Sequence, residues 1–346
     1  MKLPRPRGAL TDELFAVLRA APDTSADRID SLLAGAFERA ADLPDGAGAV
    51  HDEDLQLLLF ACYELHYRGF EEVDDGWEWS PALLRVRAIV EAVFERALME
   101  LAGEPTGSAR DVAGALTALA EVDRGPSLAA YLARRATREQ FTEFVIHRSI
   151  YHLKEADPHS WALPRIDGRS KAALVEIQVD EYGGGRPGRM HSELFAQTMR
   201  SLGLDPTYGG YVDVVPAVTL AVGNAMSLFG LHRRWRGAIL GHLAAFELTS
   251  SLPNRRYAQG LRRLGGDDRA TRFYDEHVQA DAVHEQIAVH DLCAALVARE
   301  PALAGQVLFG ATCCLELDQL AASALLESWE RRRSSLRPVQ ALPAGA

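Results

Sequence analysis

Helical spacing of apolar residues runs through this sequence and most constrains its fold. Leucine, alanine and other apolar residues recur three and four positions apart, whereas alternating β-branched runs bounded by turn signals are nearly absent. An apolar stripe with this period lies on one face of an α-helix and must pack against other helices. The sequence therefore predicts an all-α protein, and its 48% hydrophobic content over 346 residues is enough for a large core.

Capping residues and helix breakers divide the chain into separate predicted helices. Thr11 and Asp12 introduce the first helix, and the second has an N-cap serine, Ser25, and a proline stop, Pro44. The predicted helices lie at or within residues 9–21, 23–44, 53–68, 81–102, 110–121, 137–156, 170–182, 190–203, 215–229, 231–251, 268–298 and 303–332.

The clearest domain boundary is LAGEPTGSARD, residues 101–111, where glycine, proline and serine separate two helical stretches. We predict an N-terminal helical arm at 1–105, a main domain at 106–335 and a tail at 336–346. Strongly apolar stretches in the arm, such as LQLLLFACYEL, predict that it packs on the main domain or on a second subunit.

Charge and hydropathy exclude several classes of protein. The net charge of −11 argues against nucleic acid or an anionic membrane as the main partner. No stretch approaches 18 uninterrupted apolar residues, and the N-terminal MKLPRPRGALTDELF lacks the apolar run of a secretory signal. We therefore expect a cytoplasmic protein without a membrane span. Disulfides and a thiolate zinc site are not expected, because no CxxC pair occurs among Cys62, Cys293, Cys313 and Cys314.

The segment HVQADAVHEQ, residues 277–286, places metal-binding side chains on one helical stripe. At about 100° per residue, Asp281 and His284 lie within roughly 40° of His277 around the helix axis. Two imidazole nitrogens and a carboxylate oxygen suit a borderline metal such as iron, manganese or zinc. The alternative is a polar outer face of an ordinary surface helix.

Further acids and a histidine lie within otherwise apolar helical sequence. Glu155 falls near the end of one predicted helix, and Glu181 ends another, just before a glycine-rich turn and His191. Glu247 is flanked by alanine, phenylalanine and leucine, which is difficult to explain on a solvated face. An ordinary ion pair is the alternative for each acid, and Arg148 is the obvious partner for Glu155.

Taken together, these side chains predict a metal centre for one or two divalent cations, with enough ligands to hold two. Converging carboxylates without a cation repel one another, and ionised groups in a helical core are costly unless paired or coordinated. Helical bundles hold dinuclear carboxylate sites with inward-facing acids and histidines. The candidate ligands are four carboxylates and three imidazoles: Glu155, Glu181, His191, Glu247, His277, Asp281 and His284.

Four stretches between about residues 140 and 295 resemble a known family. They are KEADPHSWALPRIDG, ALVEIQVDEYGGGRPGRMHSELFAQTMRSLGLD, FELTSSLPNRRYAQGLRRLG and FYDEHVQADAVHEQIA, in that order. The sequence resembles the haem-oxygenase-like diiron oxidases and oxygenases, the iron-containing redox enzymes. The resemblance implies a helical bundle of haem-oxygenase type that binds metals instead of haem, with an N-terminal helical extension used as the contact of a homodimer.

The resemblance also implies which residues hold the metals. The family's last core helix supplies HxxxDxxH, matched by His277, Asp281 and His284, and an earlier core helix supplies a histidine, matched by His191. Further helices supply glutamates. The layout, including the extra acid Glu181, resembles the N-oxygenating members more than the fatty-acid-cleaving or lysine-fragmenting members. This subgroup assignment rests mainly on Glu155 and Glu181.

The activity implied by the resemblance is oxygen chemistry at two ferrous ions, with dioxygen as co-substrate. We expect N-oxygenation of a small amine, aminoazole or guanidine to a hydroxylamine, nitroso or nitro product in specialised metabolism. The alternatives are carbon–hydrogen abstraction with desaturation or carbon–carbon cleavage, and a metal-binding protein without turnover. Electrons must come from an external donor, because the sequence has no flavin fingerprint or ferredoxin cysteine set. No catalytic residue beyond the metal ligands is predicted.

Overall fold

The computed structural model describes residues 1–22, 26–43, 47–105, 111–122 and 124–338, with the side chains of residues 26, 47 and 280–282 left out. Every regular element in this described part of the chain is helical, which confirms the predicted all-α class. Short 3-10 turns join many of the helices.

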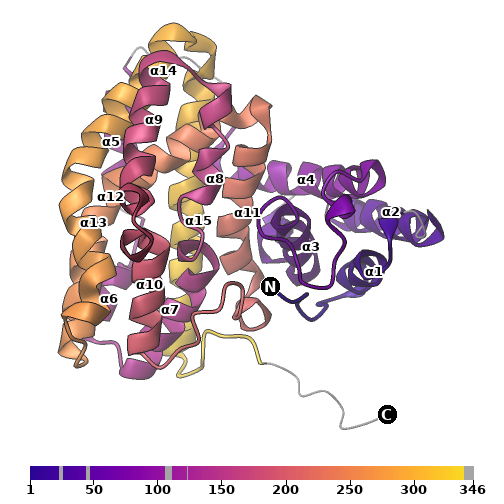
Figure 1. Ribbon diagram of the computed structural model, residues 1–346, viewed down its shortest axis with the longest axis horizontal. Helices are drawn as coiled ribbons and strands as arrows, with labels where there is room; N and C mark the ends of the chain where they lie inside the picture. The colour runs from indigo at the N-terminus through magenta and orange to yellow at the C-terminus, as the bar shows by residue number, and fades with distance from the viewer. Residues whose placement is uncertain (23–25, 44–46, 106–110, 123, 339–346) are drawn as a thin grey trace.

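The helices form an arm and a larger body (Figure 1). The arm contains α1 (Ala9–Leu18), α2 (Ala26–Asp42), α3 (Glu53–Glu64) and α4 (Pro81–Ala102). The body contains α5 (Val112–Ala120), α6 (Leu128–Arg134), α7 (Arg138–His152), α8 (Asp157–Ser160), α9 (Gly168–Glu181), α10 (His191–Ser201), α11 (Ala217–Leu231), α12 (Arg236–Arg263), α13 (Asp268–Gln286), a π-helical segment (Ile287–Ala294), α14 (Ala295–Arg299) and α15 (Ala304–Glu330).

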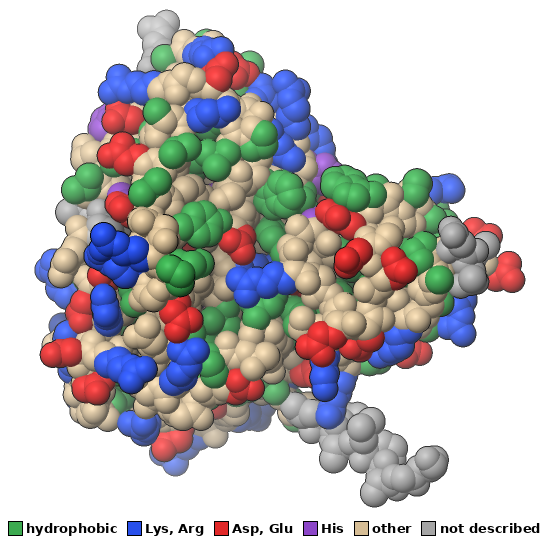
Figure 2. Space-filling model, viewed as in Figure 1, with side chains coloured by type: hydrophobic (Ala, Val, Ile, Leu, Met, Phe, Trp, Pro, Cys, Tyr) green, Lys and Arg blue, Asp and Glu red, His purple; other side chains and the backbone are tan. Residues whose placement is uncertain are grey.

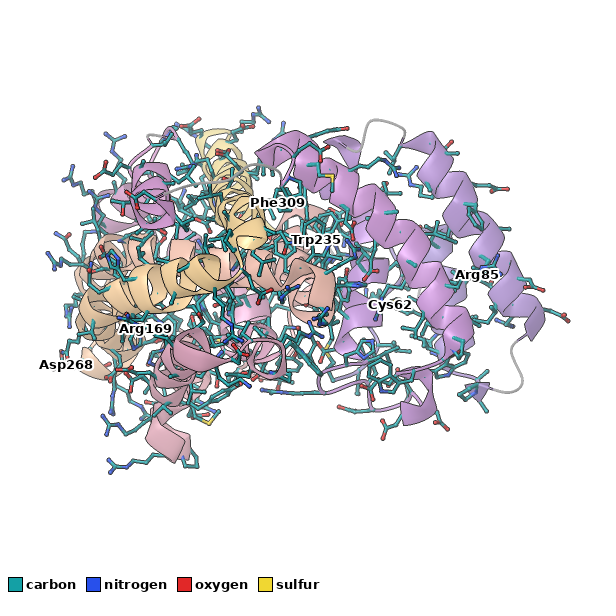
Figure 3. The ribbon with its side chains drawn as sticks, turned by 90° about the horizontal axis from the view of Figure 1, so that it is seen from above. Cys62, Arg85, Arg169, Trp235, Asp268 and Phe309 are labelled. Carbon is teal, nitrogen blue, oxygen red and sulfur yellow. The ribbon has the colours of Figure 1, made fainter. Side chains whose placement is uncertain are left out.

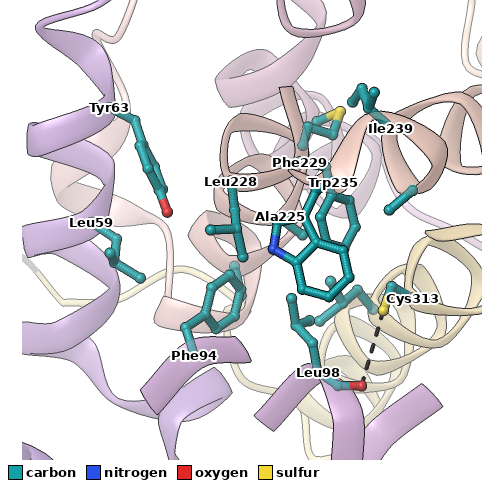
Figure 4. Close-up of a cluster of buried hydrophobic side chains, with 14 of the residues drawn as sticks. Leu59, Tyr63, Phe94, Leu98, Ala225, Leu228, Phe229, Trp235, Ile239 and Cys313 are labelled. Carbon is teal, nitrogen blue, oxygen red and sulfur yellow. Dashed lines mark hydrogen bonds between the residues drawn. The ribbon is translucent and has the colours of Figure 1, made fainter. Parts of the chain in front are cut away.

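Apolar side chains join the arm to the body. Helix α3 lies against α11, and buried residues of α1–α4 belong to the same hydrophobic cluster as those of α11, α12 and α15. Figure 4 shows part of this contact, where Phe94 of α4 faces Leu228 of α11. Seen from above in Figure 3, Cys62 and Arg85 lie on the arm, whereas Trp235 and Phe309 lie where the body meets it. The arm is therefore packed on the body along a continuous core.

The molecular surface carries mixed charge. On the face shown in Figure 2, basic and acidic side chains are interspersed over both the arm and the body. One helical stretch, Pro301–Glu330, is long and apolar enough by composition to cross a membrane. Most of it is α15, which packs against α11 and α12 and has Val307, Phe309 and Cys313 buried. Its apolar composition is accounted for by its position in the core.

Side-chain caps fix the starts of two helices that carry the site described below. Asp267 accepts a hydrogen bond from the backbone N–H of Ala270 at 2.9 Å and begins α13. At the start of α7, the N–H of Gln140 donates to Thr137 Oγ1, and the N–H of Thr137 donates to Gln140 Oε1. These local bonds satisfy donors that a helix start leaves free.

Several helix boundaries differ from the predicted ones, and three of these differences fall in segments that carry candidate metal ligands. The helix predicted at 137–156 ends at His152, and the chain turns before Pro158. The helix predicted at 231–251 continues through Pro253 to Arg263. Pro253 removes one helical hydrogen bond, and the buried contacts of the following turns with α6 outweigh this loss. The helix predicted at 268–298 changes to π-helical geometry after Gln286.

The predicted tail, 336–346, lies mostly outside the described residues. Of its described part, Arg337 donates its backbone N–H to the carbonyl oxygen of Val214 at 2.7 Å. The proposed boundary near residue 105 and the proposed dimer contact of the arm remain predictions.

Two glycines allow α12 and α15 to touch. A Cβ atom added to Gly241 would lie 1.8 Å from the carbonyl oxygen of Val307, and one added to Gly310 would lie 1.9 Å from that of Ala238. Both distances are far below van der Waals contact. The two backbones therefore approach as closely as they do only because these positions lack side chains.

We expect Gly241→Ala to destabilise the protein, because α12 and α15 must separate. Alanine favours a helix over glycine by about 1 kcal/mol, but overpacking a core costs roughly 1–3 kcal/mol or more. The control is Gly223→Ala in α11, where no atom outside the helix lies within 4 Å of an added Cβ. Urea unfolding should show a lower midpoint for Gly241→Ala and an equal or higher midpoint for Gly223→Ala. Equal midpoints for the two variants would contradict the close approach.

Candidate metal centre

Five segments of the body bring acids and histidines to one place. Glu155 comes from the turn after α7, Glu181 ends α9, His191 begins α10 and Glu247 lies in the middle of α12. His277 and His284 both lie on α13. The side chain of Asp281, predicted on the same stripe of α13, lies outside the described residues.

The first group of ligand atoms contains two acids and two imidazoles. One ligand atom from each of Glu155, Glu181, His191 and His277 lies within 4.8 Å of the others. His191 Nδ1 is 3.0 Å from Glu181 Oε2, and His277 Nε2 is 3.6 Å from Glu155 Oε1. Such a set of two oxygens and two nitrogens suits a divalent transition metal.

The second group shares one residue with the first. Ligand atoms of Glu181, Glu247 and His284 also lie within 4.8 Å of one another. His284 Nδ1 is 3.5 Å from Glu247 Oε2. A carboxylate has two oxygens, so Glu181 can face both groups at once.

Buried polar atoms without partners show that the groups fit cations. Glu155 Oε2 is buried and has no hydrogen-bond partner among the described residues. Glu181 Oε2 and His191 Nδ1 are also buried and face each other at 3.0 Å, without the geometry of a hydrogen bond. Leaving one such atom unsatisfied costs about 1–3 kcal/mol, and more when it is charged. A bound dication would satisfy all three.

Neighbouring bonds fix which imidazole nitrogen faces the centre. His277 Nδ1 donates to the carbonyl oxygen of Phe273 at 2.8 Å, which leaves Nε2 directed at Glu155. His284 Nε2 donates to Asp180 Oδ2 at 3.0 Å, which leaves Nδ1 directed at Glu247. Hydrogen bonds of this kind hold metal-binding histidines in one orientation.

The pKa values of these groups reflect burial and close opposite charge. Burial raises the pKa of Glu247, whereas His152 and His277 outweigh burial and lower the pKa of Glu155. Burial alone would lower the pKa of His284, but its contact with Glu247 raises that pKa to about 9. Without a cation, the protonated imidazole of His284 therefore offsets part of the carboxylate charge, and a metal would replace this proton.

The alternative of ordinary ion pairs is not realised for the glutamates. Arg148, the partner considered for Glu155, pairs instead with Asp318 at 2.7 Å. Within the described part of the chain, no lysine or arginine forms an ion pair with Glu155, Glu181 or Glu247. The basic side chains close to these three acids are all histidines. No permanently charged side chain of the protein therefore neutralises these acids.

A cavity of about 570 Å³ connects the centre to the surface. Its lining includes Glu155, Glu181 and Glu247 as well as exposed residues such as Ser127, on the loop before α6. Phe246 lines it next to the centre. The polar residues Arg148, Asp318, Asn254 and Tyr257 line it elsewhere. A second pocket of about 500 Å³ reaches His191 and His284 from the side of the glycine-rich turn after α9.

Several residues at the site were not among the predicted metal ligands. His152 Nδ1 lies 2.6 Å from Glu155 Oε1 and fixes that carboxylate. Asp180 contacts His284, and Gln178 lines the large cavity. Their only sequence signal is proximity to Glu155 and Glu181, because helical position alone does not show which neighbouring element each side chain meets.

Two sequence comparisons show which known proteins this chain is similar to. A family model described as iron-containing redox enzyme matches residues 142–319, just over half of the 346-residue chain. The nitrosourea synthase of Streptomyces achromogenes subsp. streptozoticus is 28% identical over 147 residues, which is 42% of this chain and 31% of that protein. The matched part of the chain thus spans about a third of that relative's length. The observed all-α fold is that of the haem-oxygenase-like proteins.

Proposed function

This chain belongs to the iron-containing redox enzyme family, and from that premise we propose that it is a non-haem diiron oxygenase that uses dioxygen to N-oxygenate a small amine, aminoazole or guanidine. Membership of the family supports an oxidoreductase that contains iron. The similarity to the nitrosourea synthase supports nitrogen as the site of oxidation. An external donor supplies the electrons.

The observation that carries the proposal is the position of Glu181 between two groups of ligand atoms. Glu155, His191 and His277 would hold one iron, Glu247 and His284 would hold the other, and Glu181 would serve as a ligand shared by the two sites. Asp281 completes the set that the family resemblance implies. These residues would hold the two irons, and the irons when bound supply the electrons that activate dioxygen.

The protein residues around the cavity bind and orient the substrate. Tyr151 and Phe246 lie with ring centroids 5.4 Å apart and form an apolar wall beside the acids. This wall lowers the polarity beside the acids and so favours a neutral, unprotonated substrate nitrogen. Polar groups farther along the cavity, including Asn254 and Asp318, can bind the remainder of the substrate.

A second candidate function is oxidation at carbon, with desaturation or carbon–carbon cleavage. The observation that favours it is the apolar surface of Ile177, Leu243 and Phe246 beside the acids. An alkyl group of a substrate would pack there. The two functions differ in whether nitrogen or carbon is oxidised.

The decisive experiment is anaerobic reconstitution with ferrous iron, followed by metal counting and exposure to isotopically labelled dioxygen with a panel of amines. We expect two irons per chain, oxygen uptake that depends on the amine, and label in a nitrogen–oxygen bond of the product. Label at carbon, or a desaturated product, would favour the second function. Less than one iron per chain, or no oxygen uptake, would contradict both.

Asp180 provides a test of the second iron site alone. Asp180→Asn removes the carboxylate that accepts a hydrogen bond from His284 Nε2. Loss of such a partner typically weakens metal binding 10–100-fold. We expect calorimetric titration with ferrous iron under anaerobic conditions to show this loss at the second site and an unchanged first site. The matched control is Glu176→Gln, an exposed acid one turn earlier in α9, which should bind both irons as the unaltered protein does.

A further inference from the structure

Gln178 lies on the same face of α9 as Glu181, three residues before it. Its side chain is buried, with 5% of its surface exposed. It lines the large cavity together with Glu155, Glu181 and Glu247. A polar side chain is thus placed next to the acids of the metal centre without being one of the candidate ligands.

The two ends of the Gln178 amide have different surroundings. Nε2 donates a hydrogen bond to the carbonyl oxygen of Ala156 at 3.2 Å. Oε1 is buried and has no hydrogen-bond partner among the described residues. The orientation is set by Ala156, because its carbonyl oxygen can only accept, and a reversed amide would bring two acceptors together. The bond to Ala156 therefore presents Oε1 as an acceptor.

A buried acceptor without a partner is unfavourable by about 1–3 kcal/mol. Such atoms are rare in folded proteins, and each one needs an explanation. Packing does not explain this one, since a leucine of similar volume would fill the same place without the unsatisfied oxygen. The acceptor is explained if a ligand that enters the cavity donates a hydrogen bond to it.

We propose that Gln178 is a substrate-binding residue whose Oε1 accepts a hydrogen bond from an N–H group of the substrate. This inference rests on the proposed function and narrows its substrate class. The nitrogen must carry at least one hydrogen, as in a primary or secondary amine, an amino group on an aromatic ring, or a guanidine. Tertiary amines and hydrocarbons lack the donor. The same bond places the nitrogen, and not a carbon, beside the acids that Gln178 adjoins.

The test compares pairs of ligands in which N-methylation removes the N–H donor, and the variants separate the loss of the donor from the added bulk. The probes are 4-methylaniline with N,N,4-trimethylaniline, and phenylguanidine with its fully N-methylated form, titrated calorimetrically into the protein loaded with zinc. We expect the N–H forms to bind roughly tenfold more tightly, the equivalent of one hydrogen bond of about 1.4 kcal/mol. Gln178→Leu should abolish this preference, and Gln178→Glu, which keeps an acceptor oxygen, should retain it.

The control variant is Asn254→Leu, which removes another buried amide from the wall of the same cavity. It should change the affinity for both members of a pair equally and leave their ratio unchanged. The inference is overturned if the unaltered protein shows no preference for N–H forms, including the case in which none of the probes binds, or if Gln178→Leu keeps the preference. Metal counting and oxygen uptake are measured separately. A protein that binds two irons and consumes oxygen without this preference would therefore retain the diiron assignment and lose only the role of Gln178.

Discussion

Glu181→Ala is expected to abolish stable binding of both irons and to lower oxygen uptake by at least about 100-fold. Glu181 belongs to both groups of ligand atoms, so its removal takes a ligand from each. Loss of a residue that only supports a ligand already costs 10–100-fold in metal affinity, and loss of a shared ligand must cost more. Iron counting after anaerobic reconstitution and gel filtration measures the effect.

The comparison variant is Glu247→Ala, which belongs to the second group alone. It should keep close to one iron per chain, whereas Glu181→Ala keeps almost none. Neither variant should unfold without metal, because Glu181 and Glu247 repel each other in the empty centre and loss of either acid removes this repulsion. Burial raises the pKa of Glu247, and the charge of Glu181 raises it further. If both variants retained the same amount of iron, Glu181 would not bridge two sites.

Lys154→Met is expected to destabilise the protein by about 3–5 kcal/mol, because it leaves a buried carboxylate without its cation. Lys154 Nζ lies 3.2 Å from Glu64 Oε2, and the two side chains are 4% and 0% exposed. Tyr208 donates its hydroxyl to the same oxygen at 2.7 Å, and Lys154 Nζ lies 4.1 Å from the ring centroid of Tyr67. Urea unfolding of the metal-free protein measures the loss.

Two further variants test whether the loss of stability comes from the buried pair itself or from the loss of any contact between the arm and the body. Lys154→Met combined with Glu64→Leu should recover much of the stability, because replacement of both partners leaves no buried charge. Arg234→Met removes a partly exposed pair with Glu95, which also joins the body to the arm. That loss should be below about 1 kcal/mol. A double variant as unstable as Lys154→Met alone would show that the cost does not come from the unpaired charge.

The buried pair also connects the arm to the metal centre. Lys154 directly precedes Glu155, in the turn between α7 and α8, and Glu64 is the last residue of α3 in the arm. The position of the turn that presents Glu155 is therefore fixed partly from outside the body. The pair explains why Glu64 is buried in the arm, although its position on α3 gives no sign of a link to the site.

Much of the fold follows from local sequence. The all-α class follows from the three-and-four spacing of apolar residues, and α4 occupies the predicted residues 81–102 because Ser80 and Pro81 define its start and Gly103 its end. The shared orientation of His277 and His284 on α13 also follows from helical geometry. Each of these properties depends on residues within a few turns of one another, so the sequence alone determined them.

Other properties depend on how the helices cross, and only the tertiary structure decided them. Arg148 pairs with Asp318 of α15 and not with the nearby Glu155, because the side chain that it meets is set by the neighbouring helix. Helix α12 continues past Pro253 because its last turns are buried against α6. The shared position of Glu181, the bond from His284 to Asp180 and the free oxygen of Gln178 arise in the same way. Residues distant in the sequence make these contacts, and single-sequence periodicity carries no information about their distances.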